Sequence, residues 1–588
     1  MKRGKVKQIL ALTLTVALLG ALAGGCAGKN DESGQPDAKE AETMGEAQAS
    51  GENGEAVSEK DLYMIDVMPN SPAQDSSLDT AVGRELAERF GIGFHYIEYN
   101  GDMQEKQAAM LAGGDYNEIQ CMEKTAISDQ YIKAGVLLDL DDYKDLLPDF
   151  YERFKDIIPY WRLLSRDGGL HLWQAPVPND YLSTMSHYNI AVRTDVLEYY
   201  GWPNLVTASD WIEFLKKAVK DFPETYDGTP TVGLTLPGAE SYGMNLLAAP
   251  NEEGDTYAVD IGGVNWVYNL KTEQFEDAWH TAEKKECLKF FHDLYQEGVL
   301  DPEMFTDTID MTVEKMSNGS AIAVWYVKWN SKDANQKLAA AGHPEMSYIE
   351  QPFQLDSQEG QKFVAAALYT YPHNQWGVTD KCKDPEKFFQ LLNWCCTEEG
   401  QLLLQNGIEG VHYEMQNGER VPTEFYGEMI RDVALLGSEG LPGGPGSELY
   451  PLKLFPYCVT TSEDGRPYNL GLEQEYADKF ALSDREKEAF QGLGWNSSQQ
   501  WWMDHGELVD VTIVSSCELD RTSDLGKIEE KLNEVYQKYA GQIVIADDFE
   551  KAFADMMAEY EKLDYQSVID ARNTLLKENK EELAEAMK

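Results

Sequence analysis

The stretch LYMIDVM (62–68), followed by TAVGRELAERF (80–90) and GFHYIEY (93–99), determines the fold class of this chain. The first and last segments are short β-type runs, and the middle one has the apolar spacing of an amphipathic helix. Asp79 is the expected N-cap of that helix, and Gly91 follows its expected last residue. A strand, a helix and a strand in such close succession predict a βαβ unit whose two strands are parallel.

Similar helix signals recur downstream. Thr207 to Asp210 has the pattern of a capping box before WIEFLKKAVKDF, and Asp384 with Pro385 predicts the start of one long helix that ends at Gly407. From about Leu525 to Lys588 the sequence is helical and amphipathic. This alternation of strand-like and helix-like runs predicts an α/β fold.

Composition limits the function classes. The 588 residues include 50 Lys plus Arg and 102 Asp plus Glu, for a net charge of −52. Nucleic-acid binding and docking to an anionic membrane surface are both disfavoured, because both need clustered basic residues. The 13 Trp and 31 Tyr and the 43% apolar content are typical of a folded protein, not of a disordered acidic chain.

The N-terminus predicts export and lipidation. Residues 1–26 have a basic start and an apolar run, 9–23, that is shorter than the about 20 residues a membrane span needs, as in a secretory signal peptide. The run ends in LAGGC (22–26), which resembles a bacterial lipobox, although Leu22 lies one position further from the cysteine than usual. We expect Cys26 to be lipidated. An ordinary signal peptide with a chance cysteine is the alternative.

Residues 27–60 lack Phe, Trp, Tyr, Ile and Leu and are rich in Gly, Ala, Ser and acids. Such a segment cannot bury enough apolar surface to offset its loss of conformational entropy. We expect a disordered acidic tether between the lipid anchor and the folded body, at the extracellular face of a bacterial cell membrane.

Five segments of the body resemble one family, and they occur in that family's order. They are MLAGGDYNEI (110–119), YIKAGVLLDLDDY (131–143), DGGLHLWQAPVP (167–178), YNIAVRTDVLEYYGWPNLVTASDWIEFLKKA (188–218) and DPEKFFQLLNWCCTEEGQLLLQNGIEGVHY (384–413). The chain therefore resembles the extracellular solute-binding proteins of family 1, the carbohydrate-uptake type, in their long lipoprotein branch.

The resemblance implies a two-lobed periplasmic-binding-protein-like fold of class II, with a hinge between the lobes and helices at the C-terminus. Lobe 1 would comprise 61–187 and about 373–430, and lobe 2 would comprise 188–372 and about 431–588. The partners would be an oligosaccharide and the transmembrane permease subunits of an ABC importer, and we expect a monomer. The chain has no G-x-x-x-x-G-K-[ST] loop, so energy would come from another subunit.

A sugar site needs aromatic platforms with a few polar side chains around them, because sugar rings present apolar faces edged by hydroxyls. For each aromatic candidate, core packing is the alternative role. Asn70 follows the first strand, where a turn role is equally expected, and Glu409 and His412 are candidates by resemblance. The ligand-binding candidates are Asn70, Trp173, Tyr242, Trp266, Trp325, Trp329, Trp376, Glu409 and Trp495.

We expect no metal and no cofactor. The segment DFPETYDGTPTVGL (221–234) lacks the ligand spacing of the calcium loop that some members of the branch carry, and the histidines form no zinc motif. Seven cysteines besides Cys26 include no C-x-x-C, and adjacent Cys395 and Cys396 could not easily bridge. Buried free thiols are favoured over a disulfide framework.

Two other functions stay open. A tethered glycoside hydrolase would need two carboxylates flanking the sugar bond, which 102 acidic residues neither exclude nor support. A binding protein for a peptide or another solute could use the same fold. The main hypothesis is a substrate-binding component of an importer, with no catalytic residues.

Overall fold

The computed structural model describes residues 59–69, 75–97, 99, 101–122, 125–165, 167–174, 190–239, 256–257, 265–325, 331–361, 363–367, 375–431, 433–442, 452–457, 461–510 and 512–587. The predicted βαβ unit is confirmed: β1 (Tyr63–Met68) and β2 (Ile92–Tyr96) are parallel and are linked by α2 (Ala81–Phe90). Gly91 ends the helix in the left-handed conformation, with φ 64°. The predicted N-cap was wrong by one residue, because the Thr80 hydroxyl, not Asp79, accepts the hydrogen bond from Gly83 N.

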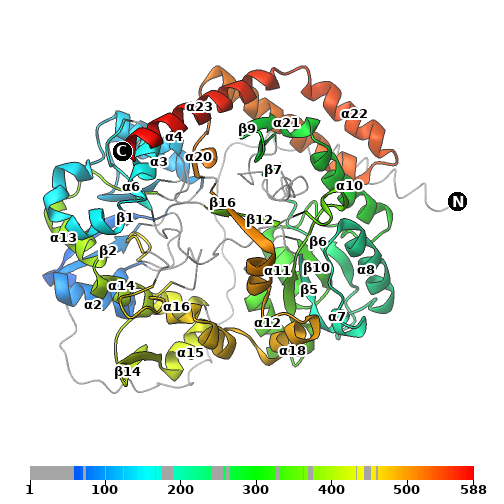
Figure 1. The fold of residues 1–588 in the computed structure, drawn as a ribbon, viewed down its shortest axis with the longest axis horizontal. Coiled ribbons are helices and arrows are strands. Elements are labelled where there is room, and N and C mark those ends of the chain that lie inside the picture. The colour runs from blue at the N-terminus through cyan, green and yellow to red at the C-terminus, as the bar shows by residue number, and fades with distance from the viewer. Residues whose placement is uncertain are drawn as a thin grey trace, which may run out of the picture. The chain divides into compact units, whose positions relative to one another are not determined.

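The first lobe is built on a five-stranded mixed sheet in the order β2-β1-β3-β13-β4 (Figure 1). Strand β13 (Gln375–Val378) is antiparallel to both β3 (Ile119–Met122) and β4 (Trp173–Gln174), so a late segment of the chain is inserted between two early ones. The helices of this lobe are α2, α3 (Met103–Gly113), α4 (Thr125–Lys133), α5 (Pro148–Arg153), α6 (Ile158–Ser165), α13 (Pro385–Cys395), α14 (Glu398–Asn406), α15 (Glu424–Arg431), α16 (Val433–Glu439) and α17 (Gln474–Tyr476).

One hydrophobic core unites this sheet with segments distant in sequence. It runs from Ile65 through Trp376 to Leu441, Phe455 and Phe480. The core therefore extends well beyond the expected boundary near residue 430. A hairpin of β14 (Tyr413–Gln416) and β15 (Glu419–Pro422) lies within this part of the chain.

The second lobe has a four-stranded sheet in the order β11-β5-β10-β6. Its core joins this sheet to the C-terminal helices, from Ile190 to Tyr560 and Val568. The strands are β5 (Ile190–Arg193), β6 (Val232–Thr235), β10 (Ala321–Trp325) and β11 (Tyr348–Gln351), and the helices are α7 (Thr194–Tyr199), α8 (Ala208–Asp221), α10 (Ala282–Gln296), α11 (Ile309–Ser317), α12 (Ser331–Ala340), α18 (Asp484–Leu493), α19 (Ser498–His505), α20 (Thr512–Ser515), α21 (Asp524–Ile545), α22 (Phe549–Tyr560) and α23 (Tyr565–Ala586).

The described residues form two further small sheets besides the β14–β15 hairpin. Strands β7 (Thr256–Tyr257), β8 (Trp266–Asn269) and β9 (Gln274–Asp277) form an antiparallel sheet that packs on α23. Strands β12 (Phe363–Ala367) and β16 (Gly506–Asp510) pair in parallel. Because β12 precedes β13 of the first lobe and β16 precedes the C-terminal helices, this strand pair lies where the chain passes between lobes.

Two of the predicted helix starts are confirmed by their caps. Thr207 and Asp210 form the predicted capping box of α8, and Asp384 caps α13 with Pro385 at its first turn. The single helix predicted up to Gly407 is instead two, because Thr397 interrupts it and caps α14 by accepting a hydrogen bond from Gly400 N.

The thiol prediction is confirmed for the described cysteines, whose thiols are buried and form no disulfide: Cys121, Cys287, Cys382, Cys395, Cys396 and Cys517. Cys458 lies outside the described residues. Burial raises the pKa of the Cys287 and Cys395 thiols well above their ordinary value. These cysteines pack as small apolar side chains and not as a covalent framework.

Candidate functional site

The two sheets are joined at their strand ends. Strand β4 ends at Gln174, and the next strand among the described residues, β5, begins at Ile190. It returns from Ala367, the end of β12, to Gln375, the start of β13. In open α/β sheets, ligands bind at the carboxyl ends of parallel strands. These strand ends define the candidate site.

Three buried glutamines lie at this edge of the first sheet. Gln375 is directly opposite Met122 on one side and Gln174 on the other, and Gln120 lies two residues before Met122. Directly opposed residues, and residues two apart on one strand, project from the same face of a sheet. Gln120, Gln174 and Gln375 therefore form a row of amides on one face, and each is at most 3% exposed.

Gln120 is fully buried, and among the described residues neither its Nε2 nor its Oε1 has a hydrogen-bond partner. The neighbouring Gln107 of α3 donates from Nε2 to the Cys121 carbonyl at 2.5 Å, while its Oε1 likewise has no partner among the described residues. Such groups are uncommon in folded proteins and mark places where water or a ligand supplies the missing hydrogen bond. The glutamine row has spare hydrogen-bonding capacity.

Ion pairs stabilise the edge of the second sheet at which strand β6 ends. Thr235, the last residue of β6, donates to Asp301 at 2.8 Å, and Lys315 Nζ lies 2.7 Å from Asp301 and 2.6 Å from Asp307. Burial raises the pKa of Asp307, opposed by the hydrogen bond from Lys315. The Asp307 and Met304 carbonyls accept from Ala239 N and Gly238 N, so this network fixes the segment that follows β6.

The structure places three of the predicted aromatic residues at these strand ends but points their rings into the cores. Trp173 and Trp376 are directly paired, and Trp173 Nε1 donates to the Leu454 carbonyl at 2.7 Å. Trp325 ends β10, and its ring centroid lies 4.8 Å from that of Phe353. All three are at most 1% exposed, so no ring face is available for stacking in this structure. Core packing is the role that the structure shows for these three residues, and their role as sugar platforms stays a prediction.

The other described candidates lie elsewhere. Trp266 of β8 is buried under Arg572, whose guanidinium carbon lies 4.4 Å from the ring centroid. Trp495 is partly exposed and lies 5.5 Å from the Trp501 ring. Trp266 packs in a small hydrophobic core, and a binding role for Trp266 and for Trp495 stays a prediction.

The turn after α14, which holds the candidates Glu409 and His412, is stabilised by hydrogen bonding of His412. His412 is fully buried; its Nδ1 accepts from Ile408 N at 2.8 Å, and its Nε2 lies 3.4 Å from Glu439. Glu409 is exposed in the turn that His412 stabilises. A ligand contact by Glu409 stays a prediction. Asn70, Tyr242, Trp329 and Cys26 lie outside the described residues, as do the signal peptide and all but the last two residues of the tether.

The glutamine row was missed at the level of sequence. Its signal is a glutamine inside otherwise apolar strand segments, namely IQCM (119–122), LWQ (172–174) and QWGV (375–378). A polar side chain in a strand buried on both faces is a departure that can be recognised from sequence.

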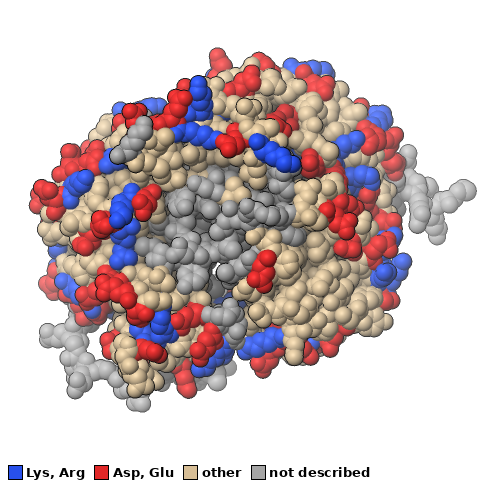
Figure 2. Space-filling model, in the orientation of Figure 1, with Lys and Arg blue, Asp and Glu red and all other residues tan. Residues whose placement is uncertain are grey.

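Surface charge, metal-ligating groups and helix hydropathy further describe the chemistry available to the described residues. On the face in Figure 2, Lys and Arg are interspersed among the more numerous Asp and Glu and form no basic patch. Within the described ranges, no group of three or more His, Cys, Asp or Glu side chains is arranged to hold a metal ion. None of the helices in the described part of the chain is both long and apolar enough to cross a membrane.

Two α/β lobes joined by crossings at their strand ends define the class of two-lobed ligand-binding proteins. The chain belongs to the bacterial extracellular solute-binding proteins, whose family model matches residues 81–408.

The similar proteins agree with this assignment. A Bacillus subtilis relative, lipoprotein LipO, is 21% identical over 231 residues, which cover 39% of this chain and 44% of that protein. This chain therefore aligns with less than half of that relative's length. An HMO-binding, ABC-transporter-associated solute-binding protein from Bifidobacterium longum infantis superposes with a TM-score of 0.61 at 14% identity, covering 88% of this chain and 98% of that one.

The Streptococcus pneumoniae ABC-transporter substrate-binding protein FusA, solved in complex with kestose, has a TM-score of 0.57 at 14% identity, with 88% and 99% of the two chains covered. At such identities the structural likeness establishes the fold, which is the predicted two-lobed one.

Proposed function

We propose that this protein is the lipid-anchored, extracellular substrate-binding component of an ABC importer, and that it captures an oligosaccharide between its two lobes. The observation that carries the proposal is that the chain connects the two sheets at their strand ends, with the glutamine row buried at that edge of the first sheet. A ligand held there would contact both lobes and favour the closed arrangement.

The ligand class follows from hydrogen-bonding chemistry. An amide side chain both donates and accepts, as a sugar hydroxyl does, so a row of amides matches a hydroxylated ligand better than a charged one. Two solved structures with this fold, the HMO-binding protein and FusA in complex with kestose, support the same ligand class. A peptide or another solute stays the alternative, because fold does not determine the ligand.

Delivery requires a membrane permease. The described chain contributes folded lobes and no helix that could form a transport path. In this proposal the closed, loaded protein docks on the permease, and cytoplasmic ATPases supply the energy. The lipobox-like sequence and the lipoprotein relative support an anchor at Cys26 on the outer face of the membrane.

The ligand test uses the full chain with Cys26→Ser, so that no acyl group is attached. A set of neutral oligosaccharides is screened by thermal shift, and hits are measured by calorimetry with product analysis of the same mixtures. We expect stoichiometric binding, a raised melting temperature and unchanged sugar. Sugar cleavage would favour the glycoside hydrolase, and stabilisation by peptides alone would contradict the sugar assignment.

The anchor test compares the natural chain with Cys26→Ser in a bacterial host. We expect the natural chain in the membrane fraction with incorporated labelled palmitate, and the variant in the soluble extracellular fraction. Equal membrane retention of both chains would contradict lipidation at Cys26.

A further inference from the structure

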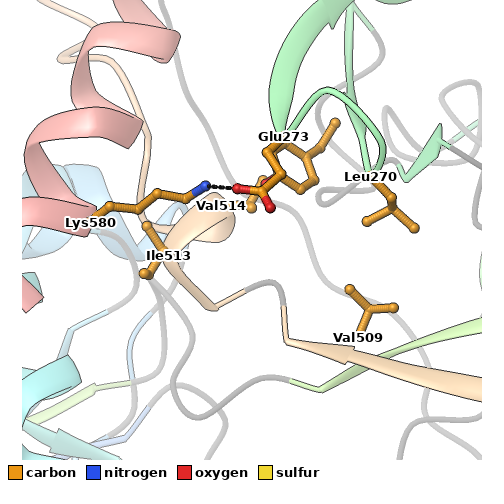
Figure 3. Close-up of a pocket in the computed structure, with 7 residues that line it drawn as sticks. Leu270, Glu273, Val509, Ile513, Val514 and Lys580 are labelled. Carbon is orange, nitrogen blue, oxygen red and sulfur yellow. Dashed lines mark hydrogen bonds and ion pairs between the residues drawn. The ribbon is translucent and has the colours of Figure 1, made fainter. Parts of the chain in front are cut away.

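A pocket lies apart from the glutamine row, between the β8–β9 hairpin, strand β16 with helix α20, and helix α23 (Figure 3). Its cavity volume is about 250 Å³, just below the roughly 300–1,000 Å³ of drug-sized ligand sites, so it suits a small ligand. The residues that line it are Tyr268, Leu270, Glu273, Val509, Ile513, Val514 and Lys580.

The lining has an apolar wall and a polar rim. Leu270, Val509, Ile513 and Val514 supply aliphatic surface, and in Figure 3 the side chains of Leu270 and Val509 point toward each other across the space. At the rim, Lys580 Nζ lies 2.8 Å from Glu273 Oε2, and both side chains are partly exposed. The two charges compensate each other, so the rim favours a polar head without net charge.

The pocket walls are fixed in place. Asn573 of α23 accepts from Phe275 N at 2.8 Å and donates to the Phe275 carbonyl at 3.0 Å, which locks the helix to β9. Arg572 donates to the Cys517 carbonyl at 2.6 Å, and Asn579 donates to Ser516 Oγ at 3.0 Å, which locks the helix to the segment after α20. A pocket with rigid walls needs little ordering when a ligand binds.

Glu273 is held in an unfavourable backbone conformation. Its φ is 52°, in the left-handed region that a long side chain seldom adopts. The turn before it is fixed by Asn269 Oδ1, which accepts from Lys271 N and Thr272 N. Such strain is concentrated at functional sites, and here it places a carboxylate at the mouth of the pocket.

We propose that this pocket is a second binding site, for a small neutral amphipathic molecule whose apolar body lies on the aliphatic wall and whose hydroxyl or amide head bridges Lys580 and Glu273. The head accepts a hydrogen bond from the ammonium group and donates one to the carboxylate. The proposal does not depend on the proposed sugar site, because none of the lining residues belongs to the glutamine row.

The test titrates 2-naphthol, which has an apolar body and one hydroxyl, into the full chain with Cys26→Ser by calorimetry without detergent. We expect saturable binding of one molecule per chain, weakened by at least about tenfold when Leu270→Trp fills the pocket or Lys580→Met removes the donor. Naphthalene-2-sulfonate, whose anionic head meets Glu273, should bind more weakly than 2-naphthol, and glucose should not compete.

The matched control is Lys577→Met, on the same helix, where the Lys577 side chain is 77% exposed and its Nζ lies 4.0 Å from Glu581 Oε1. This variant should keep the natural affinity. Absence of saturable 2-naphthol binding overturns the proposal, as does unchanged affinity in folded Leu270→Trp. If Leu270→Trp fails to fold, Lys580→Met decides, since it alters only the rim.

Discussion

Gln120 combines complete burial with an amide that has no hydrogen-bond partner among the described residues. A buried polar group in this state costs about 1–3 kcal/mol, and replacing it with an apolar group of similar shape recovers part of that cost. Its retention in the first lobe is consistent with a role in binding and not in stability.

Substitution of Gln120 with methionine tests whether this amide lowers stability and contributes to ligand binding. We expect Gln120→Met to raise the free energy of unfolding by about 1 kcal/mol, measured by denaturant titration, and to weaken any oligosaccharide found in the screen. The control is Gln401→Met: Gln401 is equally buried, but its Nε2 donates to the Cys395 and Pro456 carbonyls at 2.7 and 3.0 Å. That variant should lose stability. A similar loss in both would contradict the role assigned to Gln120.

Asp464 gives a pH prediction. Burial opposes its ionisation, but hydrogen bonds from Arg420 and Ser462 lower its pKa from 3.8 to about 2. Because the folded-state pKa lies below the unfolded one, the contribution to stability is complete above about pH 4 and is lost as the pH falls through about 2. Asp464→Asn should therefore flatten the fall of unfolding free energy between pH 4 and pH 2. An unchanged slope would show that the pair with Arg420 does not govern acid stability.

For the candidate aromatic residues, the sequence predicts the position along a strand but not the side of the sheet on which the ring lies. Their positions at strand ends were predictable for Trp173, Trp325 and Trp376, but the face on which each ring lies was not. Strand β4 has two residues and β13 is buried on both faces, so neither has the alternation of apolar and polar residues that would identify the solvent side.

Helix α12 contacts helix α15 across the boundary between the lobes. Lys332 Nζ donates to the Ile430 carbonyl, and Gln336 Nε2 donates to the Arg431 carbonyl at 2.6 Å. These carbonyls end α15 and have no partner within the helix, and the negative end of the helix dipole favours the lysine. Since α12 belongs to the second lobe and α15 to the first, the contact holds the lobes in their present arrangement.

Removing this contact between α12 and α15 should let the two lobes move further apart. We expect Lys332→Met combined with Gln336→Ala to increase the radius of gyration of the ligand-free protein in solution X-ray scattering and to speed hydrogen exchange at the end of α15. Lys337→Ala, at an exposed position of the same helix, should change neither quantity. Identical scattering from the double variant and the natural chain would contradict a clamping role.

Helix starts were predictable because capping chemistry is local. Thr207, Asp384 and Gly91 act within a few residues of the ends they define. The break at Thr397 was missed because the apolar spacing continues through it, and only the side-chain hydrogen bond to Gly400 N marks a new start.

The two-lobed architecture was predictable from the order of segments, but the extent of each core was not. Leu441 and Phe455 join the first core from a stretch rich in glycine and proline, which has no helix or strand period. Their burial depends on contacts with strands more than 300 residues earlier, such as that of Phe455 with Phe94, whose ring centroids are 5.7 Å apart. Long-range packing of this kind leaves no local pattern.

Helix α23 contacts elements of both lobes. It packs on α21, α20 and β9, and also on α6 of the first lobe. Truncation after residue 564 should lower the melting temperature markedly and shift tryptophan emission to longer wavelength, because Trp266 loses the Arg572 cover and Leu576. Truncation after residue 585 keeps Leu583 and should leave both unchanged. Normal emission from the shorter chain would contradict a structural role for α23.

The insertion of β13 between β3 and β4 has a consequence for how the chain is made. Synthesis proceeds from the N-terminus, so the first sheet lacks an internal strand until residues 375–378 emerge, and its core is incomplete until Phe480. The second core waits still longer, for Tyr560 and Val568. Non-local pairing of this kind folds slowly. Neither core can therefore be complete until most of the chain has been synthesised, so in the proposed export route the chain would meet the membrane before either lobe has its full core.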